Sequence, residues 1–251
     1  MQDEKPWYDN DDVWAKVEPV LFNTVSIGNA SRQIDNIIKL IDLKTEMRIL
    51  DLCSGVGRHS LELARRGYRV TAVDRTIHYL DRAKAMASAE KLDVEFIQED
   101  MRTFRRPHTY DVILNISTSF GYFENPENDV TVIRNIYESL KDGGILLFEM
   151  NGKEINARNF SERDWDMMDD LIVAEERKVI GDWESIDLRW VIMDPKEGYV
   201  NDVKMNVRLY SAGELKRLLL DNGFREAKAY GSLEGIPYDH QARRLVVVAR
   251  K

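Results

Sequence analysis

A buried strand that runs directly into a glycine-rich turn and then a helix is the feature that most constrains this chain. Residues 47–52 are apolar enough for a buried strand, Gly55 and Gly57 mark the turn, and the helical pattern of residues 58–66 ends at Gly67. Glycines let a backbone turn sharply and let a ligand approach it closely. The segment therefore predicts a ligand site at the carboxyl end of a strand, although a tight connection without a ligand would need the same glycines.

The alternation of strands and helices continues beyond this unit. Helical spacing is found at residues 77–90 and 128–140, and apolar strand patterns are found at residues 69–73, 93–97, 110–116 and 145–150. Strands separated by helices form βαβ units and a parallel sheet. Residues 225–231 and 244–250 have no helix between them, which predicts an antiparallel end to the sheet.

The rhythm changes after residue 155. Residues 186–192 and 203–209 alternate apolar and polar side chains on either side of a turn at 194–198, which predicts an antiparallel hairpin, and residues 171–180 predict a further strand. Ser211 and Glu214 then form a capping box that begins a new helix. We therefore expect one domain from residues 1–155 and 210–251, with residues 156–209 inserted as an antiparallel β lid over the substrate.

Composition narrows the class of partner. Hydrophobic residues make up 43% of the chain and charged residues 32%, and the formal net charge is -8. An acidic chain does not favour a nucleic-acid backbone as its main partner. The apolar runs are too short to span a bilayer, the first seven residues lack the layout of a secretory signal, and the single cysteine, Cys53, has no partner for an internal disulfide. These observations predict a cytoplasmic protein without a membrane segment.

Two carboxylates accompany the glycine turn. Asp51 precedes it, and Asp74 ends the next strand, where a carboxylate can accept both hydroxyls of a ribose. The stretch from Asp51 to Asp74 resembles the first two motifs of the class I S-adenosylmethionine-dependent methyltransferases, and the likeness extends over most of the chain. Cys53 departs from the family pattern because it occupies the first glycine position. The resemblance implies an α/β fold with a Rossmann-like, seven-stranded, mostly parallel sheet whose last strand is antiparallel, plus the inserted antiparallel β lid.

The resemblance also implies a cofactor, S-adenosyl-L-methionine, and its product, S-adenosyl-L-homocysteine. Asp51 would lie near the methionine part, Asp74 would hold the ribose, and Asp100 would accept from the adenine amino group, although Asp100 is equally suited to a turn or a helix cap. Asn115 and Ile116 would lie near the sulfonium methyl. The positions assigned to the cofactor are Asp51, Cys53, Gly55, Gly57, Asp74, Arg75, Asp100, Met101, Asn115 and Ile116.

The expected reaction is methyl transfer to a nitrogen or oxygen of a small molecule. A sulfonium methyl is already activated, so positioning and desolvation do most of the work and no metal site is expected. Asn115 and Tyr122 are the candidate catalytic residues. The candidate substrate contacts are Tyr8, Tyr122, Arg189, Arg208 and Tyr238. Trp7, Tyr8 and Trp14 are candidates for a lid, or for a helix packed on the sheet edge.

Several alternatives stay open at this point. A nicotinamide-dependent oxidoreductase would share the glycine turn and Asp74, but Ser60 stands where its motif expects glycine or alanine. A non-catalytic module could instead use Trp190 and Ile192 as the interface of a homodimer. The segment that follows Asn115 departs from the motif of nucleic-acid amino-group methyltransferases, which points away from DNA and RNA bases.

Overall fold

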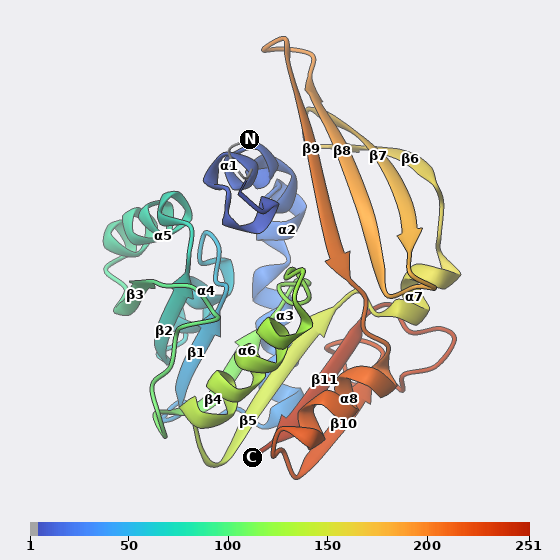
Figure 1. The fold of residues 1–251 in the computed structure, drawn as a ribbon. Coiled ribbons are helices and arrows are strands. Elements are labelled where there is room, and N and C mark those ends of the chain that lie inside the picture. The colour runs from blue at the N-terminus through green and yellow to red at the C-terminus, as the bar shows by residue number, and fades with distance from the viewer. Residues whose placement is uncertain (1–4) are drawn as a thin grey trace.

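The computed structural model describes residues 5–251, so residues 1–4 of the expected range 1–155 lie outside the described part. Its centre is a seven-stranded sheet with the strand order β10-β11-β5-β4-β1-β2-β3 (Figure 1). The strands are β1 (Arg48–Leu52), β2 (Arg69–Asp74), β3 (Val94–Gln98), β4 (Tyr110–Asn115), β5 (Leu140–Met150), β10 (Glu226–Tyr230) and β11 (Leu245–Arg250). β11 runs antiparallel to both of its neighbours, whereas β1 to β5 pair in parallel. The predicted fold class is confirmed.

Helices cover both faces of this sheet, because side chains alternate across each strand. Leu50 of β1 packs with α6 (Pro126–Ser139) and α8 (Ala212–Asp221) on one face, and Ile49 packs with α3 (Ala30–Ile41) and α4 (Arg58–Arg65) on the other. The predicted capping box of Ser211 and Glu214 begins α8. α5 (Ile77–Glu90) lies against β2 and β3.

A second sheet stands apart from the first (Figure 1). It contains four antiparallel strands in the order β6 (Arg163–Met168), β7 (Leu171–Ile180), β8 (Ser185–Asp194) and β9 (Tyr199–Arg208), and the short helix α7 (Lys153–Arg158) leads into it. The hairpin predicted from the alternating residues is β8 and β9. β6 was not predicted, because this edge strand is almost entirely exposed and has no buried apolar row to reveal it.

The N-terminal segment forms three short helices, η1 (Trp7–Asp9), α1 (Asp11–Leu21) and α2 (Thr24–Gly28). α1 lies between the two sheets, and its Val17 and Val20 pack against Ile192 and Met205 of the second sheet. Among the residues described, no helix is long and apolar enough to cross a membrane.

Candidate functional site

The glycine turn after β1 adopts the backbone that its sequence predicts. Gly55 and Gly57 have φ angles of 56° and 75°, and Cys53 has a φ of 65°, a left-handed conformation that is uncommon for a non-glycine residue. The turn is tied to the neighbouring strand, since the Ser54 N–H donates to the carbonyl of Val73 over 3.0 Å. It therefore opens at the carboxyl ends of β1 and β2.

Asp74 ends β2 and faces this turn. Its two carboxylate oxygens accept the backbone N–H groups of Gly55 and Thr76, each over 2.8 Å. Burial raises the pKa of Asp74 in spite of these hydrogen bonds. Because a carboxylate oxygen has two lone pairs, each oxygen keeps one acceptor site for another donor.

Asp51 is buried in β1, the strand that pairs with β2. The Ser60 hydroxyl, in the first turns of α4, donates to its Oδ2 over 2.5 Å. Burial raises the pKa of Asp51 to about 6, against the opposing effects of the Ser60 hydrogen bond and the Arg58 charge. Ser60, which argues against a dinucleotide motif, is thus the hydrogen-bond partner of the first acidic residue.

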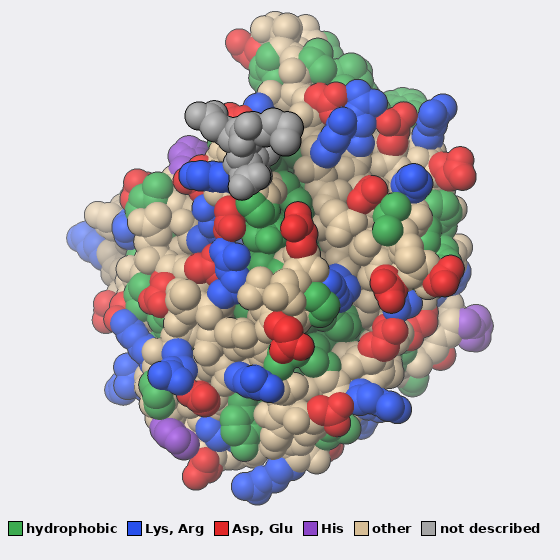
Figure 2. All heavy atoms as spheres, in the orientation of Figure 1, with side chains coloured by type: hydrophobic (Ala, Val, Ile, Leu, Met, Phe, Trp, Pro, Cys, Tyr) green, Lys and Arg blue, Asp and Glu red, His purple; other side chains and the backbone are tan. Residues whose placement is uncertain are grey.

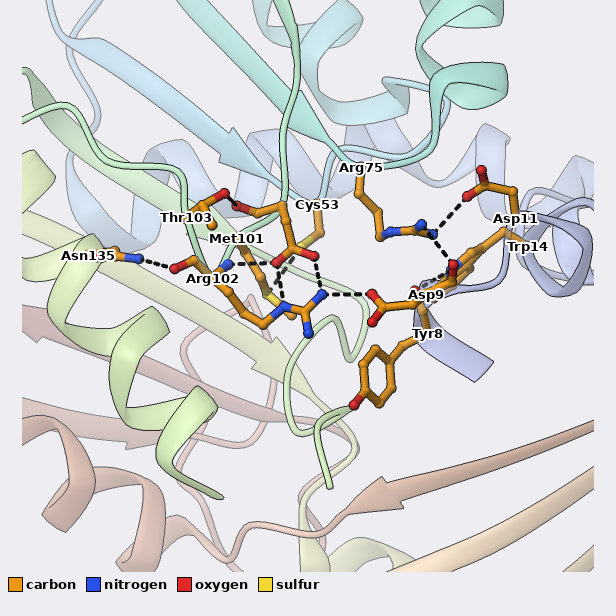
Figure 3. Close-up of polar contacts among 11 residues, drawn as sticks. Tyr8, Asp9, Asp11, Trp14, Cys53, Arg75, Met101, Arg102, Thr103 and Asn135 are labelled. Carbon is orange, nitrogen blue, oxygen red and sulfur yellow. Dashed lines mark hydrogen bonds and ion pairs between the residues drawn. The ribbon is translucent and has the colours of Figure 1, made fainter. Parts of the chain in front are cut away.

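The loop after β3, whose Met101, Arg102 and Thr103 are labelled in Figure 3, supplies a third carboxylate, that of Asp100. Arg102 donates to both of its oxygens, over 2.9 Å from Nε and 2.7 Å from Nη2. Burial alone would raise the pKa of Asp100, but the hydrogen bonds and charge of Arg102 lower it below its usual value. Met101 places its sulfur 3.5 Å from the Cys53 sulfur, so this loop is in contact with the glycine turn.

The N-terminal segment is bound to the same region (Figure 3). Arg102 donates to Asp9 over 2.6 Å, and Arg75 pairs with Asp11 over 2.9 Å. The Tyr8 ring lies against Phe123 and below the Arg102 guanidinium. η1 and α1 therefore cover the loop after β3 and the carboxyl end of β2.

These groups surround one cavity, which we call the glycine-turn cavity. It contains about 980 Å³ of space outside atoms, including the part open to solvent. Its walls include the predicted residues Tyr8, Asp51, Cys53, Gly55, Asp74, Arg75, Asp100, Met101, Ile116 and Tyr122. Gly57 does not line it and instead begins α4 in a left-handed conformation. Asn115 does not line it either.

Asn115 is buried at the end of β4 and holds the backbone around it. Its Nδ2 donates to the carbonyls of Leu52 over 3.2 Å and Ser119 over 3.3 Å. The side chain thereby connects β1 to the loop that carries Tyr122. The structure thus gives Asn115 a positioning contact rather than a place on the cavity wall.

The loop after β4 has an unusual conformation. Ser117 and Thr118 are consecutive non-glycine residues with φ angles of 66° and 62°. Residues in this region cost free energy unless the surroundings determine their conformation. The Tyr122 hydroxyl donates to the Thr118 carbonyl over 2.7 Å, so the orientation of Tyr122 depends on this backbone.

An ion pair between Glu149 and Arg244 fixes the conformation of the loop after β4. Glu149, buried at the end of β5, accepts the Ser117 N–H over 2.8 Å and also binds the Arg244 guanidinium. Arg244 donates in turn to the Thr118 hydroxyl over 3.1 Å. On the opposite side, Arg58 donates to the Ser117 hydroxyl over 2.5 Å. Residues from β5, from α4 and from the segment just before β11 therefore fix one short loop.

A second cavity adjoins the first, and we call it the inter-sheet cavity. It lies between the four-stranded sheet, α1 and α2, and the loop after β4, and it contains about 1710 Å³ of space outside atoms, including the part open to solvent. Five residues line both cavities, namely Trp14, Leu21, Arg58, Ser117 and Tyr122. The two cavities therefore meet at the loop that Glu149 and Arg244 hold.

Three of the predicted substrate residues lie outside both cavities. Arg189 is on the outer face of the four-stranded sheet, where it pairs with Asp202 over 2.6 Å and Glu176 over 3.0 Å. Arg208 donates to the carbonyls of Phe123 and Glu124.

Tyr238, the third of them, donates to Glu154 over 2.9 Å. None of the three lines either cavity. Their polar groups pair with neighbouring strands and loops, and their role as substrate contacts stays a prediction.

Other wall residues were not predicted from the sequence. Phe22 covers the glycine turn so closely that a Cβ on Gly55 would lie 2.5 Å from its ring. Glu149 and Arg244 are far apart in sequence, and no motif connects them. The burial of Glu149 in an otherwise apolar strand was the one signal that could have identified it. In residues 5–251 no cluster of three or more His, Cys, Asp or Glu side chains is placed to hold a metal ion.

Comparison with known proteins identifies the domain type. Residues 49–144 match the family model described as "Methyltransferase domain". "Putative methyltransferase GWCH70_2453" of Geobacillus sp. (strain WCH70) is 33% identical over 104 residues, which cover 41% of this chain and 42% of that protein. "Putative methyltransferase YqeM" of Bacillus subtilis (strain 168) is 24% identical over 208 residues, which cover 81% of this chain and 84% of that protein.

Solved structures with the same fold extend the likeness to the whole chain. The CcbJ methyltransferase of Streptomyces caelestis superposes with a TM-score of 0.81 at 17% identity, and covers 99% of this chain and 98% of its own. The sugar N-methyltransferase KedS8 of Streptoalloteichus sp. ATCC 53650 gives a TM-score of 0.67 at 15% identity, with coverages of 100% and 95%. At these identities the likeness establishes the fold.

Proposed function

This chain carries a class I S-adenosylmethionine-dependent methyltransferase domain, and we propose that it transfers the methyl group to a nitrogen or oxygen of a small-molecule acceptor. The observation that carries the proposal is the meeting of two cavities at Arg58, Ser117 and Tyr122. One cavity has the carboxylates that suit the cofactor, and the other leaves space for an acceptor beside it.

The residues of the glycine-turn cavity fit the cofactor. Asp74 keeps two free acceptor positions, which suit the two hydroxyls of a ribose. The Ser54 hydroxyl in the turn is buried without a hydrogen-bond partner among the described side chains and backbone, so a bound polar group would satisfy it. Asp51 and Arg58 supply opposite charges for the two ends of an amino acid.

The protein's own part in the reaction is to bind, orient and exclude water. When bound in the glycine-turn cavity, S-adenosylmethionine would supply an activated methyl group, and the acceptor would supply the lone pair that receives it. Tyr122 and Ser117 orient the acceptor where the cavities meet. Tyr8, Trp14 and Phe22 keep water away, which suits a step between desolvated partners.

Two further observations support a small acceptor. Acidic and basic side chains are interspersed on the face shown in Figure 2, rather than gathered into a basic surface for nucleic acid. In addition, one solved structure with this fold carries the name sugar N-methyltransferase, and the match covers 95% of its chain.

Calorimetric titration with S-adenosylmethionine, S-adenosylhomocysteine and NADH tests the cofactor. We expect the two sulfur compounds to bind with micromolar affinity and Asp74→Ala to weaken both by about 100-fold, since hydrogen bonds to a charged group contribute about 1.5–3 kcal/mol each. Asp129→Asn is the control, because Asp129 is also buried but lies on α6, outside the cavity. Binding of NADH without the sulfur compounds would overturn the proposal.

A further inference from the structure

The walls of the inter-sheet cavity differ in polarity from one end to the other. At the end shared with the glycine-turn cavity lie Arg58, Ser117, Glu149, Asn151 and Arg244. The remaining walls are mostly apolar where the inner face of β8 and β9 faces α1. α2 and its flanking residues add polar side chains to the lining, and the edge of the four-stranded sheet adds Asp166 and Asp169.

The sheet side of the cavity is a continuous apolar surface. The register pairs Leu188 with Met205 and Trp190 with Val203 across β8 and β9. Residues two apart in a strand share a face, so Leu188 and Trp190 form one row and Met205 continues it on the next strand. All three line the cavity.

The opposite wall is aromatic and aliphatic. It is lined by Trp14 and Leu21 of α1, together with Trp7 and Tyr122. The ring centroids of the two tryptophans and Tyr122 lie 4.9–5.8 Å from one another. A flat apolar group therefore has rings on one side and the sheet on the other. Stacked and edge-on aromatic contacts favour such a group.

Size points in the same direction. The cavity has a volume of about 730 Å³, within the range of about 300–1,000 Å³ that is typical of pockets for drug-sized ligands. An acceptor as small as an amino acid would leave water against most of the apolar wall. A bulky acceptor would displace that water, which is favourable.

From these observations we infer that the acceptor is a bulky amphiphilic molecule whose flat apolar body packs between Trp190, Leu188 and Met205 and the α1 wall. Its amine or hydroxyl lies at Arg58, Ser117 and Tyr122. Glu149 and Arg244 lie at the same end of the cavity, so the hydrogen-bonding groups for that polar atom are gathered there. The inference rests on the proposed function and specifies its substrate class.

Trp190 is the residue that determines this preference. Of the described residues that line the cavity, it is the one aromatic side chain that the four-stranded sheet contributes. Because flat aromatic groups stack favourably on such a ring, Trp190 selects for a flat acceptor body.

The test uses the full chain loaded with S-adenosylhomocysteine and two matched series of probes. The amines are glycinamide, 2-phenylethylamine and tryptamine, and the hydroxyl compounds are ethanol, phenol and 5-hydroxyindole. Calorimetry is expected to show affinity that rises about tenfold from the smallest to the largest member of at least one series. Trp190→Ala is expected to abolish that gain.

Trp165→Ala is the matched control, because Trp165 is 66% exposed on the outer face of the same sheet and lines neither cavity. Met205→Ala replaces Trp190→Ala as the test variant if the latter fails to bind S-adenosylhomocysteine. Equal affinity across both series, no binding by either aromatic series, or equal losses in Trp165→Ala and the test variant would overturn the inference. Failure of the unmodified protein to bind S-adenosylhomocysteine would instead overturn the proposed function beneath it.

Discussion

The two cavities of this molecule are built in different ways. The acidic wall of the glycine-turn cavity comes from one continuous stretch of the chain, from Asp51 to Asp100, in which each carboxylate lies in the last residues of a strand or just after it. The inter-sheet cavity instead needs the N-terminal helices, the loop after β4, three strands of the second sheet, and Arg244, the residue before β11. Local sequence is therefore enough to build one recognition site, whereas the other exists only after distant segments have packed together.

Alanine substitutions in the glycine turn and in the loop after β4 should show which of the two segments is rigidly packed. A Cβ on Gly121 would lie 2.7 Å from the backbone oxygen of Arg208, whereas one on Gly55 would meet the Phe22 ring, a side chain that can move. Both residues have positive φ, so each alanine lowers the free energy of unfolding by about 1–2 kcal/mol through its strained backbone conformation. At Gly121 the clash with the backbone lowers it by about a further 1–3 kcal/mol. Urea denaturation should therefore show a greater loss for Gly121→Ala than for Gly55→Ala.

Gly67→Ala is the control for these two variants, because Gly67 has a φ of 83° but nothing within 4 Å of an added Cβ. Its loss of stability should be the smallest of the three. If Gly121→Ala and Gly67→Ala were equally stable, the contact between the loop after β4 and the second sheet would be adaptable rather than rigid.

Glu149→Gln should separate loop positioning from cofactor binding. The variant removes the negative charge that pairs with Arg244. It also weakens the hydrogen bond that the Ser117 N–H donates to this side chain. Because the loop that Glu149 holds carries Tyr122, and a small misplacement of a positioning residue lowers the rate strongly, we expect methyl transfer to fall by about 10–100-fold. The affinity for S-adenosylhomocysteine should stay within about twofold. Radiolabelled methyl transfer and calorimetry measure the two quantities.

Glu95→Gln provides the comparison for that experiment, because the Glu95–Arg106 ion pair lies on the surface near β3. Its turnover should match that of the unmodified protein. A parallel loss of cofactor affinity in Glu149→Gln would mean that the two cavities do not function separately.

Two buried carboxylates offer a matched pH experiment across the two regions. Burial raises the pKa of both Asp51 and Asp129 to about 6. The folded protein therefore binds these protons more tightly than the unfolded chain, and stability falls as the pH rises from about 4 to 6. Asp51→Asn and Asp129→Asn should each raise the melting temperature at pH 8, and the gain should shrink below pH 6.

The same two variants should differ in ligand binding. S-adenosylhomocysteine binding should weaken only in Asp51→Asn, because Asp51 lines the glycine-turn cavity and Asp129 does not. In the unmodified protein, the affinity should decrease as the pH falls through about 6 and Asp51 is protonated. An affinity that does not change between pH 5 and 8 would remove Asp51 from the cofactor contacts.

The smallest effect is expected where the N-terminal segment is bound to the loop after β3. Asp9→Asn weakens the pair with Arg102, and partly exposed pairs contribute about 0–1 kcal/mol. The dissociation rate of S-adenosylhomocysteine should rise about two- to fivefold in stopped flow, with little change in the melting temperature. Asp12→Asn, whose pair with Lys16 lies on the surface of α1, should leave the rate unchanged.

The sequence alone determined the main sheet, its antiparallel end and the carboxylates around the glycine turn. Their positions follow from strand ends and from the conformational freedom of glycine, both of which are local properties. It also predicted the hairpin of β8 and β9 from alternation. It did not reveal β6, because an exposed edge strand has no buried row of side chains to mark it.

Only the tertiary structure decided which polar residues face the cavities. Arg189, Arg208 and Tyr238 were plausible from their positions, and in the structure each pairs with a nearby carboxylate or carbonyl. Glu149 and Arg244 are 95 residues apart and meet because β5 pairs with β11. A period-two pattern gives the two faces of a strand but not the segments that pack against them, and for this reason the second cavity could not be derived from local sequence.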